Sequence, residues 1–317
     1  MSSNRIITPF GAQSTAAEVV AGVDCTGRRA IVTGGASGIG TETARALASA
    51  NAEVTLAVRN IAAGELVARD IIRDTGNAQV FVAPLDLADR TSIAEFVTNW
   101  QGPLHILVNN AGIMATPESR TPQGWEMQFA TNHLGHFALA TGLHGSLAAA
   151  GNARVVVVSS VGHVNGAVVF DDIHFQRRPY DAWEAYGQSK TANILFAVEA
   201  SKRWAGDGIT ANALNPGRIP GTNLSRHIGD AGNAPASFEP GSTAVSWKTP
   251  AQGAATSVLL AASPLLEGVT GRYFEDCREA EPHRPGVRRG VAAYALDPVD
   301  SARLWQVSLD TLAAAVA

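Results

Sequence analysis

The sequence predicts an α/β fold in which one doubly wound parallel sheet is covered by helices on both faces. Two observations lead to this prediction. Short apolar runs alternate with helical patterns along almost the whole chain of 317 residues, and such an alternation favours a parallel sheet with right-handed crossovers. Runs such as residues 104–108 are apolar apart from His105, which is typical of strands buried on both faces.

The composition is that of a globular protein with a large core. Hydrophobic residues make up 46% of the chain, and the net charge of -4 gives no reason to expect nucleic acid as a partner. The two cysteines, Cys25 and Cys277, exclude a disulfide framework and fit a reducing compartment. The first residues show no signal-peptide core, and no apolar run is long enough for a membrane span. We therefore expect a cytoplasmic location.

The elements follow one another in a regular order. We expect strands near residues 30–33, 53–58, 79–83, 104–108, 154–158, 209–214 and 271–274, and helices after residue 40 and near 61–73, 91–100, 122–148, 186–204, 250–262 and 298–313. Ser14 and Gly22 bound one more short helix within an N-terminal extension, residues 1–27, which we expect to cover an edge of the core. Residues 28–275 are predicted to form the main domain, and residues 276–317 a C-terminal extension packed on it.

Two stretches lack clear periodicity. Residues 163–184 make a long detour whose aromatic side chains, Phe170, Phe175, Tyr180 and Trp183, either line an apolar pocket or cover the core. Residues 218–248 are rich in Gly, Pro, Ser and Asn, and a long irregular stretch of this kind predicts a mobile lid over the substrate.

A glycine-rich turn joins the first strand to the next helix. It reads T-G-G-A-S-G-I-G from Thr33 to Gly40, with glycines at 34, 38 and 40. Glycines allow the backbone to approach a pyrophosphate, and the helix N-terminus supplies N–H groups and a positive dipole. The strand–turn–helix context therefore predicts a dinucleotide site.

Two further strand ends carry candidate nucleotide contacts. Arg59 follows the second strand, where an acid would bind the ribose of NAD and an arginine suits the 2′-phosphate of NADP. Arg59 therefore favours NADP, the alternative being a solvated arginine at a strand end. Asp86, after the third strand, either accepts from the adenine amino group or caps the following turn.

Tyr186 and Lys190 form the candidate catalytic pair. Four residues apart in A-Y-G-Q-S-K-T-A-N, they lie on one face of a predicted helix. We expect the lysine charge to lower the pKa of the phenol and make it a usable proton donor. Upstream, Asn132 stands inside a predicted helix where asparagine is unfavourable, which indicates a kink or a held water.

Three histidines are weaker candidates for a catalytic or metal-binding role. His133, His136 and His163 lack the spacing of a metal site, so we expect no metal and assign the first two to packing or capping.

Together these motifs resemble the short-chain dehydrogenase/reductase family over residues 28–275. The matching segments are T-G-G-A-S-G-I-G at 33–40, N-N-A-G at 109–112, Asn132, Ser160, Y-G-Q-S-K at 186–190 and N-P-G at 215–217. V-R-N at 58–60, T-N-H-L-G-H-F at 131–137 and Y-G-Q-S-K-T-A-N-I-L-F at 186–196 are similar to the retinol-dehydrogenase branch, which includes WW-domain oxidoreductases and protochlorophyllide reductases.

The resemblance implies a Rossmann-type fold, a catalytic tetrad and a cofactor, NADP(H). The tetrad is Asn132, Ser160, Tyr186 and Lys190, with Ser159 as the alternative serine. The implied cofactor contacts are Gly34, Ser37, Gly38, Ile39, Gly40, Arg59, Asp86, Leu87, Asn110, Ala111, Gly112, Tyr186, Lys190, Pro216, Gly217, Ile219 and Thr222. The chain departs from the family where Gly221 stands in place of the usual Thr, with Thr222 following, and where the stretch from Ser160 to Tyr186 is about twice the typical length.

The expected activity is hydride transfer between the nicotinamide and a lipophilic ketone or aldehyde, or the corresponding alcohol. Tyr186 would move the proton, Ser160 hold the carbonyl oxygen, Lys190 hold the ribose, and Asn132 orient a water. The alternatives are an NAD-dependent secondary-alcohol dehydrogenase and a non-catalytic NADP-binding sensor or partner protein. The sequence leaves open whether the protein is a monomer or a homo-oligomer, a dimer or tetramer.

Overall fold

The computed structural model describes residues 5–227 and 247–314. Within them the strands form one eight-stranded sheet in the order β3-β2-β1-β4-β5-β6-β7-β8. The strands are β1 (Arg29–Thr33), β2 (Glu53–Val58), β3 (Val80–Pro84), β4 (Ile106–Asn109), β5 (Ala153–Val158), β6 (Ile209–Asn215), β7 (Tyr273–Glu275) and β8 (Arg278–Glu279). All neighbouring pairs are parallel except β7 and β8. The α/β prediction is confirmed.

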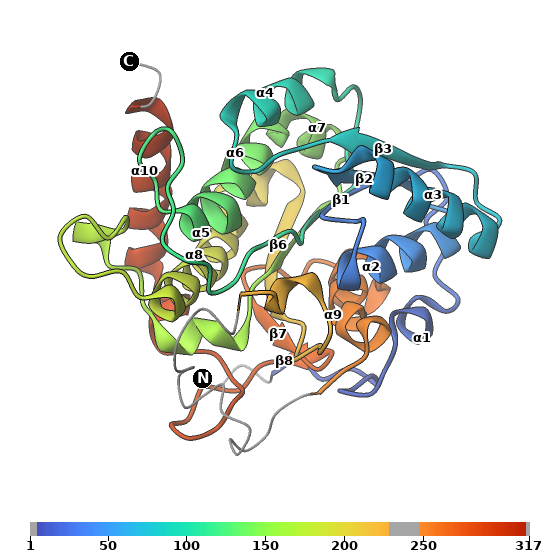
Figure 1. Ribbon diagram of the computed structural model, residues 1–317. Coiled ribbons are helices and arrows are strands. Elements are labelled where there is room, and N and C mark those ends of the chain that lie inside the picture. Colours follow the sequence, from blue (N-terminus) through green and yellow to red (C-terminus); the bar gives the residue numbers. More distant parts are fainter. Residues whose placement is uncertain (1–4, 228–246, 315–317) are drawn as a thin grey trace.

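Helices cover both faces of the sheet (Figure 1). One face carries α1 (Ala16–Val20), α2 (Gly38–Ser49), α3 (Ile61–Thr75) and α9 (Pro250–Ala262). The other carries α4 (Arg90–Asn99), α6 (Gly135–Gly142), α7 (His144–Ala149), α8 (Ala182–Arg203) and α10 (Pro298–Ala314). The short 3-10 turns are Val161–Asn165, Phe170–Asp172, Ala205–Asp207, Asn223–Ser225, Pro264–Leu266 and Ala293–Leu296.

The helix predicted over residues 122–148 is wrong in its extent and its continuity. The buried Glu126 carboxylate accepts the N–H groups of Gln128 and Phe129, so the helix starts only with α5 (Met127–Phe129). A π-helical turn, Ala130–Leu134, then links α5 to α6, and Leu143 separates α6 from α7. The π turn contains Asn132, the residue for which the sequence indicated a kink or a held water.

The first helix starts one residue later than predicted. Thr15, not Ser14, is its N-cap, and it forms a capping box in which the Thr15 hydroxyl accepts the Glu18 N–H while the Glu18 carboxylate accepts the Thr15 N–H. The helix lies against α2 and α9, on a face of the sheet.

The chain beyond β8 returns to the sheet face that carries α8. Trp305 of α10 packs against Phe137, Phe196 and Trp204, with ring centroids 4.9, 5.9 and 5.5 Å away. Strand β8 was not predicted, because two residues within an Arg/Pro-rich loop carry no readable period. Within the described residues, no helix combines the length and apolar character needed to cross a bilayer.

Candidate active site

The carboxyl ends of the parallel strands open onto one cavity of about 650 Å³. Every site residue expected from the sequence lines it except Gly40 and Asn132, which lie beneath its surface. The parallel topology accounts for this convergence, because strand ends of one direction meet at one edge of the sheet.

The glycine turn fits tightly onto the N-N-A-G turn after β4. A Cβ on Gly40 would lie 2.5 Å from the Gly34 carbonyl oxygen and 2.6 Å from Nδ2 of Asn110. That amide group donates to the Thr33 carbonyl at 2.7 Å, which fixes the two turns together. Ser37, the N-cap of α2, makes no side-chain capping bond. The first N–H groups of α2 are therefore left for a ligand, and the backbone cradle and helix N-terminus suit a pyrophosphate.

Arg59 and Asp86 both line the cavity. Arg59 is exposed after β2, and no ion pair is found for it among the described residues. Asp86 Oδ1 accepts the Ala88 N–H at 2.9 Å. Asp86 therefore stabilises the turn, as one of its two alternatives predicted, and it also lines the cavity.

Tyr186 and Lys190, both on α8, line the same cavity. The Lys190 Nζ lies 5.7 Å from the centroid of the Tyr186 ring and donates to the Val158 carbonyl at 3.1 Å. Both side chains are almost fully buried. Ser160, after β5, lies near enough to Tyr186 for its side chain to oppose the rise in the phenol pKa, and its Oγ accepts the Gly162 N–H at 3.0 Å.

The neighbouring Ser159 occupies a different environment. Its hydroxyl donates to the Lys190 carbonyl at 2.8 Å, and the residue is buried. The two serine side chains therefore have different neighbours. Ser159 connects the end of β5 to α8, whereas Ser160 lies beside the Tyr186 phenol.

The π turn directs Asn132 toward the N-N-A-G segment instead of its own helix. Its carboxamide accepts the Ile113 N–H and donates to the Ile113 carbonyl and to Ser189 Oγ, all at 2.9 Å. A Cβ on Gly112 would lie 3.1 Å from Asn132 Oδ1 and 3.5 Å from Lys190 Nζ. The amide and the ammonium therefore flank the same glycine beneath the cavity floor.

Burial dominates the electrostatics of the pair. It raises the pKa of Tyr186 to about 12, against smaller opposing effects of the Ser160 hydrogen bond and the Arg288 charge. Burial also lowers the pKa of Lys190 to about 8. The expectation that the lysine brings the phenol pKa down is wrong in this structure. The consequence is a phenol that keeps its proton at neutral pH.

The histidines form bonds within the core. His133 Nε2 meets Ser308 Oγ at 2.8 Å, and His136 bridges Thr33 Oγ1 and the Asn132 carbonyl. Burial lowers the pKa of His133 to about 3 and of His136 and His163 to about 4. In the part of the chain that the structure describes, no three His, Cys, Asp or Glu side chains gather as a metal site would require.

The aromatic residues of the detour divide between the two alternatives. Trp183 lines the cavity, while Phe175 is buried away from it and Tyr180 bonds the Thr116 carbonyl. Phe170 packs on the core with Arg303 over its ring. The detour is thus mainly a cover.

Sequence reasoning missed several residues that line the cavity. These are Met114, Arg218, Leu224, Trp247 and Arg288. Arg218 carried a usable signal, because it directly follows the N-P-G turn. Arg288 carried none, since it lies in an irregular loop far along the chain.

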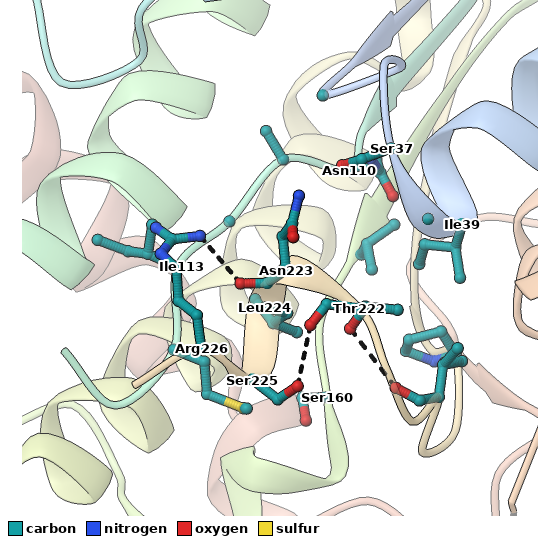
Figure 2. Close-up of a pocket in the computed structure, with 18 of the residues that line it drawn as sticks. Ser37, Ile39, Asn110, Ile113, Ser160, Thr222, Asn223, Leu224, Ser225 and Arg226 are labelled. Carbon is teal, nitrogen blue, oxygen red and sulfur yellow. Dashed lines mark hydrogen bonds between the residues drawn. The ribbon is translucent and has the colours of Figure 1, made fainter. Parts of the chain in front are cut away.

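The predicted lid, residues 218–248, falls mostly outside the described residues. Its first part, from Thr222 to Arg226, lies between Ser37 and Asn110 on one side and Ser160 on the other (Figure 2). The Thr222 side chain faces Gly38 at the start of α2, 3.6 Å from where a Cβ would stand there. Thr222 thus reaches the glycine turn although it stands one residue later than the family pattern.

Comparison with known proteins adds to this geometry. The profile of the short chain dehydrogenase family matches residues 28–232. A Streptomyces antibioticus protein described as a probable oxidoreductase is 55% identical over 311 residues, covering 92% of this chain and 100% of the relative. Mouse retinol dehydrogenase 11 is 39% identical, covering 92% and 88%. The solved Pseudomonas aeruginosa RhlG/NADP active-site complex has a TM-score of 0.60 at 27% identity, covering 80% and 97%.

Proposed function

The chain belongs to the short-chain dehydrogenase family of oxidoreductases, and on this premise we propose that it is an NADP(H)-dependent carbonyl reductase. Its substrates are lipophilic ketones or aldehydes, with the corresponding alcohols in the reverse direction. The observation that carries the proposal is that Ser160, Tyr186 and Lys190 line the same cavity, the last two of them buried.

The glycine turn, the α2 N-terminus and Arg59 are the residues that would hold the cofactor. The turn and helix end fit its pyrophosphate, and Arg59 fits a 2′-phosphate. The preference for NADP over NAD rests on Arg59, and the RhlG structure, a relative with NADP bound, supports it. Reduced NADP supplies the hydride when bound.

The protein's own groups handle the proton and the oxygen. As the carbonyl carbon gains hydride, the Tyr186 hydroxyl donates its proton to the oxygen, and the product is an alcohol. Ser160 donates a hydrogen bond to that oxygen and fixes its angle. Lys190 offers an ammonium to the ribose hydroxyls and to the phenolate that forms. Asn132 holds the Ile113 backbone and hence the floor beside Lys190.

The apolar side chains around Tyr186 support a lipophilic substrate. Met114, Trp183 and Leu224 pack in one cluster with the Tyr186 ring. Such walls exclude water from the reacting atoms and favour apolar groups. Retinol dehydrogenase 11, a relative of this chain by sequence, is consistent with that class.

Tyr186→Phe tests the proposal. It should lower kcat on a panel of ketones and aldehydes by about 10²–10⁴-fold, because the positioned proton donor is lost, while NADPH affinity stays near wild type. Tyr180→Phe is the control, since it also removes a half-buried phenol hydroxyl but lies outside the cavity. Retained kcat in Tyr186→Phe, or wild-type protein that binds NADPH and turns over nothing, would instead favour a cofactor-binding sensor.

A further inference from the structure

His163 is a buried histidine that the proposed chemistry leaves unused. It belongs to the 3-10 turn Val161–Asn165, which follows Ser160 at the end of β5, and it is 0% exposed. Burying an imidazole is costly unless both ring nitrogens find hydrogen-bond partners. Both do so here, and each partner is a backbone group.

These two partners fix the tautomer of the ring. The Ser160 carbonyl oxygen, 2.7 Å from Nδ1, can only accept, so Nδ1 carries the proton. The Ala292 N–H, 3.1 Å from Nε2, can only donate, so Nε2 carries none. Burial lowers the His163 pKa to about 4, which keeps the ring neutral at pH 7. The Tyr273 hydroxyl is farther from Nδ1, at 3.5 Å.

The Ser160 peptide group is held by both the ring and the main chain of His163. The His163 backbone N–H donates to the same Ser160 carbonyl at 3.2 Å, while Ser160 Oγ accepts the Gly162 N–H at 3.0 Å. Ser160 lines the cavity, whereas His163 does not. Because the carbonyl and Oγ belong to one residue, a rotation of this peptide group would also move the hydroxyl at the cavity wall.

The turn is packed against α8 beside Tyr186. A Cβ on Gly187, the next residue of the helix, would lie 2.9 Å from the Gly162 carbonyl oxygen. The Thr191 hydroxyl of α8 donates to the His163 carbonyl at 3.1 Å. The turn therefore has little freedom to shift along the helix.

The other side of the ring is held by the segment after β8. The Tyr294 hydroxyl donates to the His163 carbonyl at 2.6 Å, and the Gly290 N–H donates to the Glu275 carboxylate of β7 at 2.9 Å. These bonds keep the Ala292 N–H in place as the partner of Nε2. The ring cannot rotate without losing both of its backbone partners.

We propose that His163 is a positioning residue for the reduction: its Nδ1–H holds the Ser160 carbonyl and thereby sets the Ser160 hydroxyl at the angle from which it meets the substrate oxygen. This inference rests on the proposed carbonyl reduction and adds a residue that acts through Ser160. A misplacement of about 1 Å at a reacting group can cost roughly 10²-fold in rate, so the effect is measurable.

Two substitutions separate the roles of the two ring nitrogens. The carboxamide of asparagine ends near the place of Nδ1, and that of glutamine ends near the place of Nε2. His163→Asn can therefore still donate to the Ser160 carbonyl, whereas His163→Gln can meet only the Ala292 N–H. His163→Gln should lower kcat by about 10- to 100-fold and leave the KM for NADPH near wild type, while His163→Asn should retain most of kcat. Unchanged kcat in His163→Gln, or an equal loss in both variants, would overturn the inference.

A double-mutant cycle shows whether His163 acts through Ser160. Ser160→Ala should lower kcat by about 10²–10³-fold, and adding His163→Gln to it should lower kcat no further. Losses that multiply would refute the inference. His105→Gln is the matched control and should leave kcat unchanged. The Nδ1 of His105 also bonds a backbone group, the Arg29 N–H at 3.1 Å, but at the amino ends of β1 and β4, away from the cavity.

Nitrogen NMR of the histidine-labelled wild type tests the geometry without turnover. The ring signal that is missing in His163→Asn should show the Nδ1–H tautomer at pH 7. A proton on Nε2 would refute the inference even if ketones are reduced. Wild type that shows the Nδ1–H tautomer but reduces no carbonyl compound would overturn the proposed function, and the inference would fall with it.

Discussion

Replacing Lys190 by methionine should stabilise the free protein while it removes the proposed activity. Burial lowers the Lys190 pKa from 10.5 to about 8. At pH 7 the folded protein therefore carries a charged ammonium that loses its proton more readily than the same group does in the unfolded chain. At about 1.4 kcal/mol for each tenfold change in proton affinity, the cost is about 3 kcal/mol. Methionine has a similar length and carries no charge.

Lys190→Met removes one hydrogen bond whose acceptor stays satisfied. Lys190 Nζ donates to the Val158 carbonyl at 3.1 Å, but Asn193 Nδ2 also donates to that oxygen at 3.3 Å, so the carbonyl keeps a partner. We therefore expect a net gain of about 2 kcal/mol in the free energy of unfolding at pH 7.

The pH dependence provides a second readout. The pKa of Lys190 is lower in the folded protein than in the unfolded chain, so between pH 8 and pH 10.5 the unfolded chain binds more protons. The contribution of Lys190 to the free energy of unfolding of the wild type therefore rises over this pH range. Lys190→Met should lack this rise. Urea denaturation of both proteins at pH 7 and pH 10, without cofactor, measures it. A variant that is no more stable than wild type at pH 7, or that keeps the same rise, would refute the reasoning.

The other predictions concern the cofactor site and the buried histidines. Arg59→Ala should weaken NADP binding by about 10- to 100-fold and leave NAD binding nearly unchanged, because only NADP carries the 2′-phosphate; equal affinities for both cofactors in wild type would contradict the assignment. Gly40→Ala should weaken NADPH binding by about tenfold or more, since its Cβ meets the Gly34 carbonyl, whereas Gly145→Ala, with open space around it, should bind normally. Because burial lowers the His163 pKa to about 4 from 6.5, stability should fall as the pH drops from about 6.5 toward 4, and His163→Gln should reduce that slope in urea titrations; an unchanged slope would count against it.

The sequence predicted those parts of the fold that depend on local pattern. Runs such as β1 and β5 are mostly apolar and bounded by turns, so their strand character and parallel order could be read directly. A parallel sheet places the carboxyl ends of its strands at one edge, which is why residues as distant in sequence as Gly34 and Lys190 were expected there. Their convergence on a single cavity agrees with that expectation.

What could not be predicted depends on contacts distant in sequence. The late start of α5 follows from the buried Glu126 carboxylate, and the π turn is accompanied by bonds from Asn132 to Ile113 and Ser189. The Tyr186 pKa depends on how deeply the phenol is buried, which a spacing of four residues does not reveal. Arg288 lies in a loop without periodicity, which bonds to His163 and Glu275 hold in place.

The anchoring of that loop has an evolutionary consequence. The segment that carries Arg288 lies after residue 232, beyond the stretch that the family profile matches, and hydrogen bonds from Ala292 and Tyr294 join it to His163. A protein with this arrangement can acquire a new substrate when only the short loop after β8 changes, while the segment with the glycine turn stays the same. In proteins that diversify in this way, the amino-acid sequence after β8 would change rapidly and the sequence of the glycine turn slowly.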